Sequence, residues 1–163
     1  MALILGIDPG TTCVGYAIID GETGQLRAAD CLRLRSVPDV DFRLDELRRI
    51  WDGFWQAGGI FARLVAEKSP VFIERTFTQG NFGDKALAAA GHILRIPAKR
   101  AGLAVIEVSP MTVKKALTGS GKATKGEMLA FVNERYQRTF ETHDVADAIG
   151  IATYGLQQIR QGA

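Results

Sequence analysis

Four carboxylate side chains occupy positions that suggest metal chemistry. Asp8 directly follows one short apolar run and Glu74 ends another, although acidic residues are disfavoured in strands. Asp144 and Asp147 are three residues apart, and therefore lie on one face at the start of a predicted helix. Four carboxylates brought together repel one another unless a hard divalent cation such as Mg²⁺ neutralises them. We therefore expect these four residues to be both the catalytic residues and the metal ligands of one site.

Each of the four also has an ordinary structural interpretation. Asp8 could cap the Pro-Gly turn that follows it, and Glu74 could pair with Arg75. Thr142 or Asp144 could be the N-cap of the last helix, where acidic residues also favour the helix dipole. The metal interpretation is preferred because two of the carboxylates continue buried strands.

The elements that would position these residues follow from hydrophobic periodicity. Three short strands joined by tight turns predict an antiparallel meander, and a change to three- and four-residue spacing predicts helices that alternate with two more strands. The strands are expected at residues 3–7, 14–19, 26–34, 71–73 and 103–108. The helices are expected at residues 44–55, 86–96, 124–136 and 144–159, and a short helix is expected to begin at residue 110. The first helix is expected to resume after an interruption at Gly58-Gly59. Pro97 is expected to end or kink its helix. Residues 1–163 are thus expected to form one α/β domain with a mixed five-stranded sheet in which strand ends and a helix start meet at a crevice.

Composition and charge narrow the class of protein further. The chain has 163 residues, of which 47% are hydrophobic and 23% charged, as in globular proteins. No apolar run is long enough to cross a membrane and no signal peptide is evident, so a cytoplasmic location is expected. Cys13 and Cys31 have no metal-site spacing, and are expected to be small buried hydrophobic residues in a reducing compartment. Residues 95–125 carry a net charge of +6, which favours a polyanionic partner.

Motifs in sequence order resemble one family. The chain contains ILGIDPG at residues 4–10, VGYA at 14–17 and IERTF at 73–77. It continues with SPMTVKK at 109–115, GSGKATK at 119–125 and DVADA at 144–148. This series resembles RuvC, the family of bacterial Holliday-junction resolvases, over nearly the whole chain.

The resemblance implies a ribonuclease H-like fold and an activity. A member of this family is a homodimeric, Mg²⁺-dependent endonuclease that cuts four-way junction DNA during recombination and repair, and leaves 5′-phosphate and 3′-hydroxyl ends. Two Mg²⁺ ions per site, roughly 3.5–4 Å apart and replaceable by Mn²⁺, are expected, with Asp8 bridging them. The family also implies a RuvA–RuvB branch-migration complex as partner and no membrane.

The resemblance also assigns further site residues. Asp8, Glu74, Asp144 and Asp147 match its acidic tetrad, and Phe77 matches the aromatic residue that reaches into the junction. The remaining candidates are basic: Lys114 and Lys125 as active-site and DNA-contacting residues, Lys115 and Lys122 as substitutes in register, and His143 in an accessory role. For the dimer, the Ala-rich helix 86–96 is the candidate interface, since small residues allow two backbones to approach.

The chain departs from the family in the longer segment 43–70 and in having no glutamine at 126–128. Three other functions share some of these sequence features. A phosphate-binding ATPase of the actin and heat-shock superfamily would share the GIDPGTT turn, but would need a second lobe. A nuclease of the same fold acting on RNA–DNA hybrids, and a module that only binds junctions, remain the alternatives.

Overall fold

The computed structural model describes residues 2–77 and 80–162, and its centre is a mixed five-stranded sheet. The strands are β1 (Leu3–Asp8), β2 (Cys13–Asp20), β3 (Leu26–Arg33), β4 (Val71–Glu74) and β5 (Val105–Val108), in the order β3-β2-β1-β4-β5. Pairing is antiparallel between β1, β2 and β3, and parallel between β1 and β4 and between β4 and β5. The predicted meander and mixed sheet are thus confirmed.

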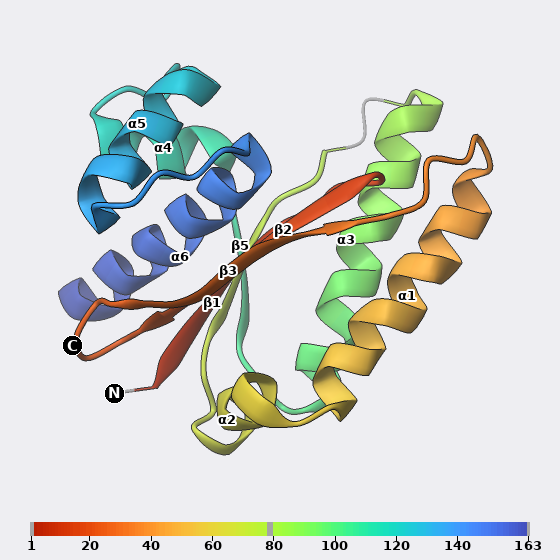
Figure 1. The fold of residues 1–163 in the computed structure, drawn as a ribbon, viewed down its shortest axis with the longest axis horizontal. Helices are drawn as coiled ribbons and strands as arrows, with labels where there is room; N and C mark the ends of the chain where they lie inside the picture. The colour runs from red at the N-terminus through yellow and green to blue at the C-terminus, as the bar shows by residue number, and fades with distance from the viewer. Residues whose placement is uncertain (1, 78–79, 163) are drawn as a thin grey trace.

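Helices cover both faces of this sheet (Figure 1). α1 (Val40–Gln56) and α3 (Phe82–Arg100) lie on one side, with α2 (Gly59–Ala66) at its end. α4 (Pro110–Thr118), α5 (Lys125–Tyr136) and α6 (His143–Gly162) lie on the other. No helix in the described ranges is both long and apolar enough to span a bilayer.

The apolar core is divided by the sheet into two clusters. Leu3, Leu5 and Ile7 of β1 point into the cluster shared with α1 and α3, where Trp51 and Leu94 are fully buried. Ile4, on the other face of β1, belongs to the cluster shared with α4, α5 and α6. A strand that is apolar on both faces must lie inside the sheet, and β1 therefore provides a rigid central position for the residue that ends it.

Local residues set the ends of two helices. Pro110 is the first residue of α4, and Gly119 ends it with a positive φ of 83°. Thr124 caps α5 through a capping box with Glu127, each side chain accepting a hydrogen bond from the other residue's backbone N–H. These caps fix where the lysine-bearing helices begin and end.

Two expectations about chain breaks have different outcomes. Gly58 and Gly59 do interrupt the first helical region, both with positive φ. Pro97, by contrast, does not end its helix, because α3 runs on to Arg100. Pro97 and Ala98 are buried in this stretch, and the Pro97 carbonyl still accepts a hydrogen bond from the Ala101 amide at 3.0 Å. Burial in the core thus offsets the one helical hydrogen bond that a proline cannot donate.

The two cysteines contradict the prediction made for them. Cys13 and Cys31 are half-buried and form a disulfide that joins β2 to β3, instead of being separate buried hydrophobic residues. Gly15 pairs with Cys31 across the strands, and Cys13 lies two residues from Gly15 on the same face. This diagonal placement leaves the two α-carbons 6.1 Å apart, within the range that a disulfide spans. Spacing along the chain does not reveal such a pairing.

Candidate active site

The ends of two parallel strands bring the first two carboxylates to one edge of the sheet. Ile7 of β1 pairs with Ile73 of β4, and each is followed by an acidic residue that ends its strand. Asp8 and Glu74 are therefore neighbours at the same end of adjacent strands. Both side chains are only partly exposed, whereas the residues that precede them are buried.

The first turn of α6 supplies the other two carboxylates. Asp144 and Asp147 lie one turn apart, and α6 packs across β1 and β2 near this end of the sheet. The close approach depends on Gly15, because a Cβ there would overlap the backbone carbonyl of Asp144. Gly6 of β1 allows a similar approach by the backbone of α6 at Ala148 and Ala152.

The electrostatics of the four residues show that they act on one another. Burial raises the pKa of Asp8 well above its usual value, and the charges of Glu74, Asp147 and Asp144 raise it further. Burial and the charge of Asp147 raise the pKa of Glu74 to about 7. The pKa of Asp147 is also raised, mainly by burial, with Asp144 adding to the rise. The structure thus brings together the four carboxylates that the sequence predicted.

The carboxylates are gathered but not in contact as a compact group. Within residues 2–77 and 80–162, no three of them place oxygen atoms all within 4.8 Å of one another. Mutual repulsion keeps such groups apart until a cation binds. A set made of oxygen donors alone fits a hard divalent cation such as Mg²⁺ or Mn²⁺.

Two lysines from separate helices offset this negative charge. Lys114 is half-buried on α4, and Lys125 is the first residue of α5, directly after the Thr124 cap. Both lower the pKa values of Glu74 and Asp147, and Lys125 also lowers that of Asp8. Their ammonium groups therefore lie close enough to act on the carboxylates.

The other basic candidates are placed differently. Lys115 and Lys122 are exposed, and neither is among the groups that shift a pKa in the tetrad. His143 begins α6 beside Asp144, is exposed, and slightly lowers the pKa of Asp147. The structure thus separates Lys114 and Lys125 from the lysines that could have replaced them.

Two exposed aromatic side chains lie in the stretch of chain between β4 and the first turn of α3. Phe77, three residues after Glu74, is 54% exposed and is therefore not a core residue. Residues 78 and 79, part of the loop expected after it, lie outside the described residues. Phe82, in the first turn of α3, is 73% exposed.

A cavity lies beside the carboxylates but is not lined by them. A cavity of about 500 Å³ lies nearby, beside β5, where Arg75, Glu107, Thr112 and Tyr154 are among its lining residues. None of the four carboxylates lines it.

The mixed sheet flanked by helices is a ribonuclease H-like fold, in which acidic residues end β1 and β4 and lie in the first turn of the last helix. Residues 4–154 match the family described as crossover junction endodeoxyribonuclease RuvC. The chain belongs to the RuvC family.

Individual relatives agree with this assignment. The crossover junction endodeoxyribonuclease RuvC of Halorhodospira halophila is 37% identical over 159 residues, covering 93% of this chain and 88% of its own. That of Moorella thermoacetica is 34% identical over 154 residues, covering 92% and 88%.

Solved structures share the fold. T. thermophilus RuvC in complex with Holliday junction substrate superposes with a TM-score of 0.75 at 22% identity, covering 99% of this chain and 97% of its own. The Holliday junction resolvase of fowlpox virus gives a TM-score of 0.52 at 14% identity, covering 99% of each chain. The predicted ribonuclease H-like fold is therefore confirmed.

Proposed function

We propose that this chain resolves Holliday junctions, cutting two opposed strands of four-way DNA by Mg²⁺-dependent hydrolysis in recombination and repair. The observation that carries the proposal is the convergence of Asp8, Glu74, Asp144 and Asp147 on one edge of the sheet, with Lys114 and Lys125 beside them. Membership of the RuvC family supports the same reaction. The junction-bound relative from T. thermophilus supports four-way DNA as the substrate.

The four carboxylates would hold the metal, which we propose to be two Mg²⁺ ions, with Mn²⁺ able to replace them. When bound, these ions supply the charge that activates water and stabilises the leaving 3′ oxygen. Asp8 is the proposed bridging ligand, because it ends the central strand and is affected by the charges of the other three. The expected products are a 5′-phosphate and a 3′-hydroxyl.

The remaining groups bind and orient the DNA. Lys114 and Lys125 would stabilise charge on the scissile phosphate, and Lys115 and Lys122 would contact phosphates further along the strand. Phe77 would stack on an unpaired base at the branch point, since exposed aromatic rings bind bases in this way. His143 would assist as an accessory group beside Asp144.

Two matched cuts require two active sites, so we propose a homodimer with two-fold symmetry. Helix α3 remains the candidate interface, but only in part. Ala86, Ala90, Gly91 and Leu94 are buried within the chain's own fold, which leaves the half-buried Leu87 and Ala88 among the residues available to a second copy. The proposed setting is the cytoplasm, with the RuvA–RuvB branch-migration complex as partner.

The decisive experiment uses a synthetic four-way junction labelled on each strand in turn. With Mg²⁺, we expect symmetrical nicks on two opposed strands that DNA ligase can seal, and no nicks after chelation of the metal. Linear duplex and RNA–DNA hybrid of the same sequence serve as competing substrates. Sedimentation should give twice the 17.7 kDa chain mass. Ala88→Glu should give monomers that lose paired nicking. Ala62→Glu, at an exposed position of α2, should remain dimeric and keep paired nicking.

Each alternative function has its own result. Cutting the hybrid faster than the junction would establish a ribonuclease instead. Tight junction binding without any metal-dependent cut would leave a binding module. A wild-type chain that stays monomeric both free and on the junction would refute the dimer.

A further inference from the structure

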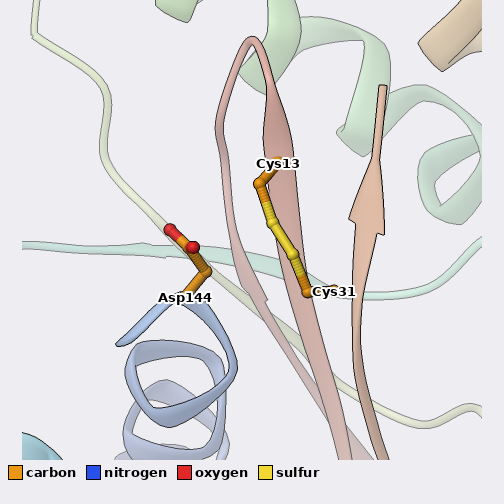
Figure 2. A group of neighbouring side chains, drawn as sticks. All are labelled: Cys13, Cys31 and Asp144. Carbon is orange, nitrogen blue, oxygen red and sulfur yellow. A yellow bond between two sulfur atoms is a disulfide. The ribbon is translucent and has the colours of Figure 1, made fainter. Parts of the chain in front are cut away.

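Three metal-ligating side chains lie together where β2, β3 and α6 meet. Figure 2 shows Cys13 and Cys31 on the strands and Asp144 in the first turn of the helix. The two sulfur atoms and a carboxylate oxygen of Asp144 all lie within 4.8 Å of one another. In the described part of the chain, no other group of three or more such side chains is gathered as closely, the catalytic carboxylates included.

The backbone holds this group in place. Cys13 and Gly15 point to the same face of β2, and Cys31 is the cross-strand partner of Gly15. Because Gly15 lacks a Cβ, the backbone of Asp144 packs directly on β2 at Gly15, next to both cysteines. The three side chains are therefore set by regular elements and not by a loop, which is the arrangement that a metal site needs.

In the structure the two sulfurs form a disulfide, and a disulfide does not provide thiolate ligands. A dithiol reductant changes this by thiol–disulfide exchange. The S–S bond gains two electrons and two protons to give two protein thiols, and the dithiol is oxidised to its own disulfide. Reduction therefore converts a covalent cross-link between β2 and β3 into two free donors close to a carboxylate.

We propose that the reduced chain binds one Zn²⁺ through Cys13, Cys31 and Asp144. Two thiolates and a carboxylate, with water in the fourth position, are a donor set typical of tetrahedral Zn²⁺. Binding releases the two thiol protons to solvent. Mg²⁺ does not compete well for this site, because it prefers oxygen donors in octahedral geometry.

The site shares Asp144 with the nuclease centre, and this has a regulatory consequence that rests on the proposed function. A Zn²⁺ ion held against the sulfurs would engage the carboxylate that the catalytic metal also needs. Zn²⁺ therefore inhibits the reduced enzyme, while the disulfide form, which lacks the two thiolates, is much less sensitive. Metal binding and inhibition are measured separately below.

The binding test uses Co²⁺ as a coloured substitute for Zn²⁺, with the full chain reduced by a dithiol that is then removed without air. Excess Mg²⁺ is present to occupy oxygen-only sites. We expect a thiolate-to-cobalt charge-transfer band that saturates at one Co²⁺ per chain and disappears when Zn²⁺ is added. Neither the oxidised chain nor the reduced chain after alkylation should develop the band.

Matched variants identify the ligands. Cys13→Ser and Cys31→Ser should each lose at least half of the band, and Asp144→Asn should weaken Co²⁺ binding roughly 10-fold or more. Asp147→Asn, one turn further along α6 and outside the group, should leave Co²⁺ affinity within about twofold. Circular dichroism of each variant verifies that it is folded, and alkylation of the wild-type chain gives the same test without any substitution.

The outcomes separate the proposals. A reduced wild-type chain without the band overturns the site, as does a band that survives alkylation or that Asp144→Asn and Asp147→Asn weaken equally. A chain that binds Co²⁺ as expected but never cuts junctions keeps the zinc site and refutes the nuclease. A chain that cuts junctions equally well with and without Zn²⁺ when reduced overturns the inhibition.

Discussion

The backbone carbonyl of Asp144 rests against the α-carbon of Gly15, in a space that a methyl group at residue 15 would fill. This contact sets the height of α6 above the sheet, and with it the positions of Asp144 and Asp147 relative to Asp8. A glycine in a strand, which weakens the strand itself, here determines the geometry of the proposed catalytic centre.

Gly15→Ala is therefore expected to displace the start of α6. Such overpacking lowers the free energy of unfolding by about 1–3 kcal/mol. The rate of junction cleavage should fall even at temperatures where the variant remains folded, because two carboxylates move together. Thermal unfolding and cleavage rates measure the two effects. Gly53→Ala is the matched control, because a Cβ there meets nothing within 4 Å and alanine should stabilise α1 by roughly 0.5–1 kcal/mol. Full cleavage by Gly15→Ala would contradict the role of this contact.

Asp8→Asn should abolish cleavage and leave junction binding intact or tighter. The substitution removes a metal ligand from the central strand, but also removes one negative charge that repels phosphate. Cleavage assays with Mg²⁺, together with gel-shift titrations without it, separate the two effects. Near-normal cleavage would refute the assignment of the tetrad, and Asp144→Asn and Asp147→Asn should behave in the same way.

Glu74 should make the metal-free chain less stable as the pH rises. Its pKa is raised from 4.5 to about 7 in the folded chain, so the folded state holds this proton more tightly than the unfolded state does. The resulting stability is fully present below about pH 4.5 and is lost as the pH passes 7. The raised pKa values of Asp8 and Asp147 act in the same direction.

The measurement is Tm in a chelator between about pH 5 and pH 8. Glu74→Gln should raise the stability at the upper pH by on the order of 1–2 kcal/mol, while Glu134→Gln on the exposed face of α5 should not. Mg²⁺ should raise the Tm of the wild-type chain most at the upper pH. Equal Tm values for wild type and Glu74→Gln at every pH would contradict the raised pKa.

Phe77→Ala should reduce junction distortion and cleavage without lowering Tm. The ring is more than half exposed, so its removal loses base stacking worth roughly 1–3 kcal/mol but little core packing. Fluorescent base analogues at the branch point report the distortion. Phe42→Ala, another exposed phenylalanine, on α1, serves as control, and a large drop in the Tm of Phe77→Ala would place the ring in the core.

Lys114 and Lys115 provide a test on consecutive residues of one helix. Lys114 acts on the pKa values of Glu74 and Asp147, and Lys115 does not. Lys114→Ala is expected to reduce kcat roughly 10²-fold, whereas Lys115→Ala should alter KM through a phosphate contact and leave kcat nearly unchanged. Equal losses of kcat would show that both ammonium groups reach the scissile phosphate.

Much of the fold follows from local patterns in the chain. Apolar runs, turn residues and the change of period locate all five strands, and Thr124 and Pro110 mark helix starts that the structure confirms. The clustering of the four carboxylates was also predictable, because strand ends and helix starts converge in such sheets. The extension of α3 through Pro97 was not, since it depends on burial that local propensity does not contain.

The details of the site depend on contacts that no linear pattern records. Lys114 and Lys115 look alike in sequence, and only the orientation of α4 distinguishes them. The Cys13–Cys31 pair depends on the register between β2 and β3. Its position beside Asp144 depends on the absence of a side chain at Gly15.

The order in which the carboxylates occur along the chain has a consequence for synthesis on the ribosome. Asp8 emerges early and the strand with Glu74 can pair with β1 while translation continues, since domains begin to fold from their N-terminal side. Asp144 and Asp147 come from the last helix, which also covers one face of the sheet. A nascent chain thus holds only half of the proposed ligand set until α6 has been made, and an unfinished polypeptide is expected to have no nuclease activity.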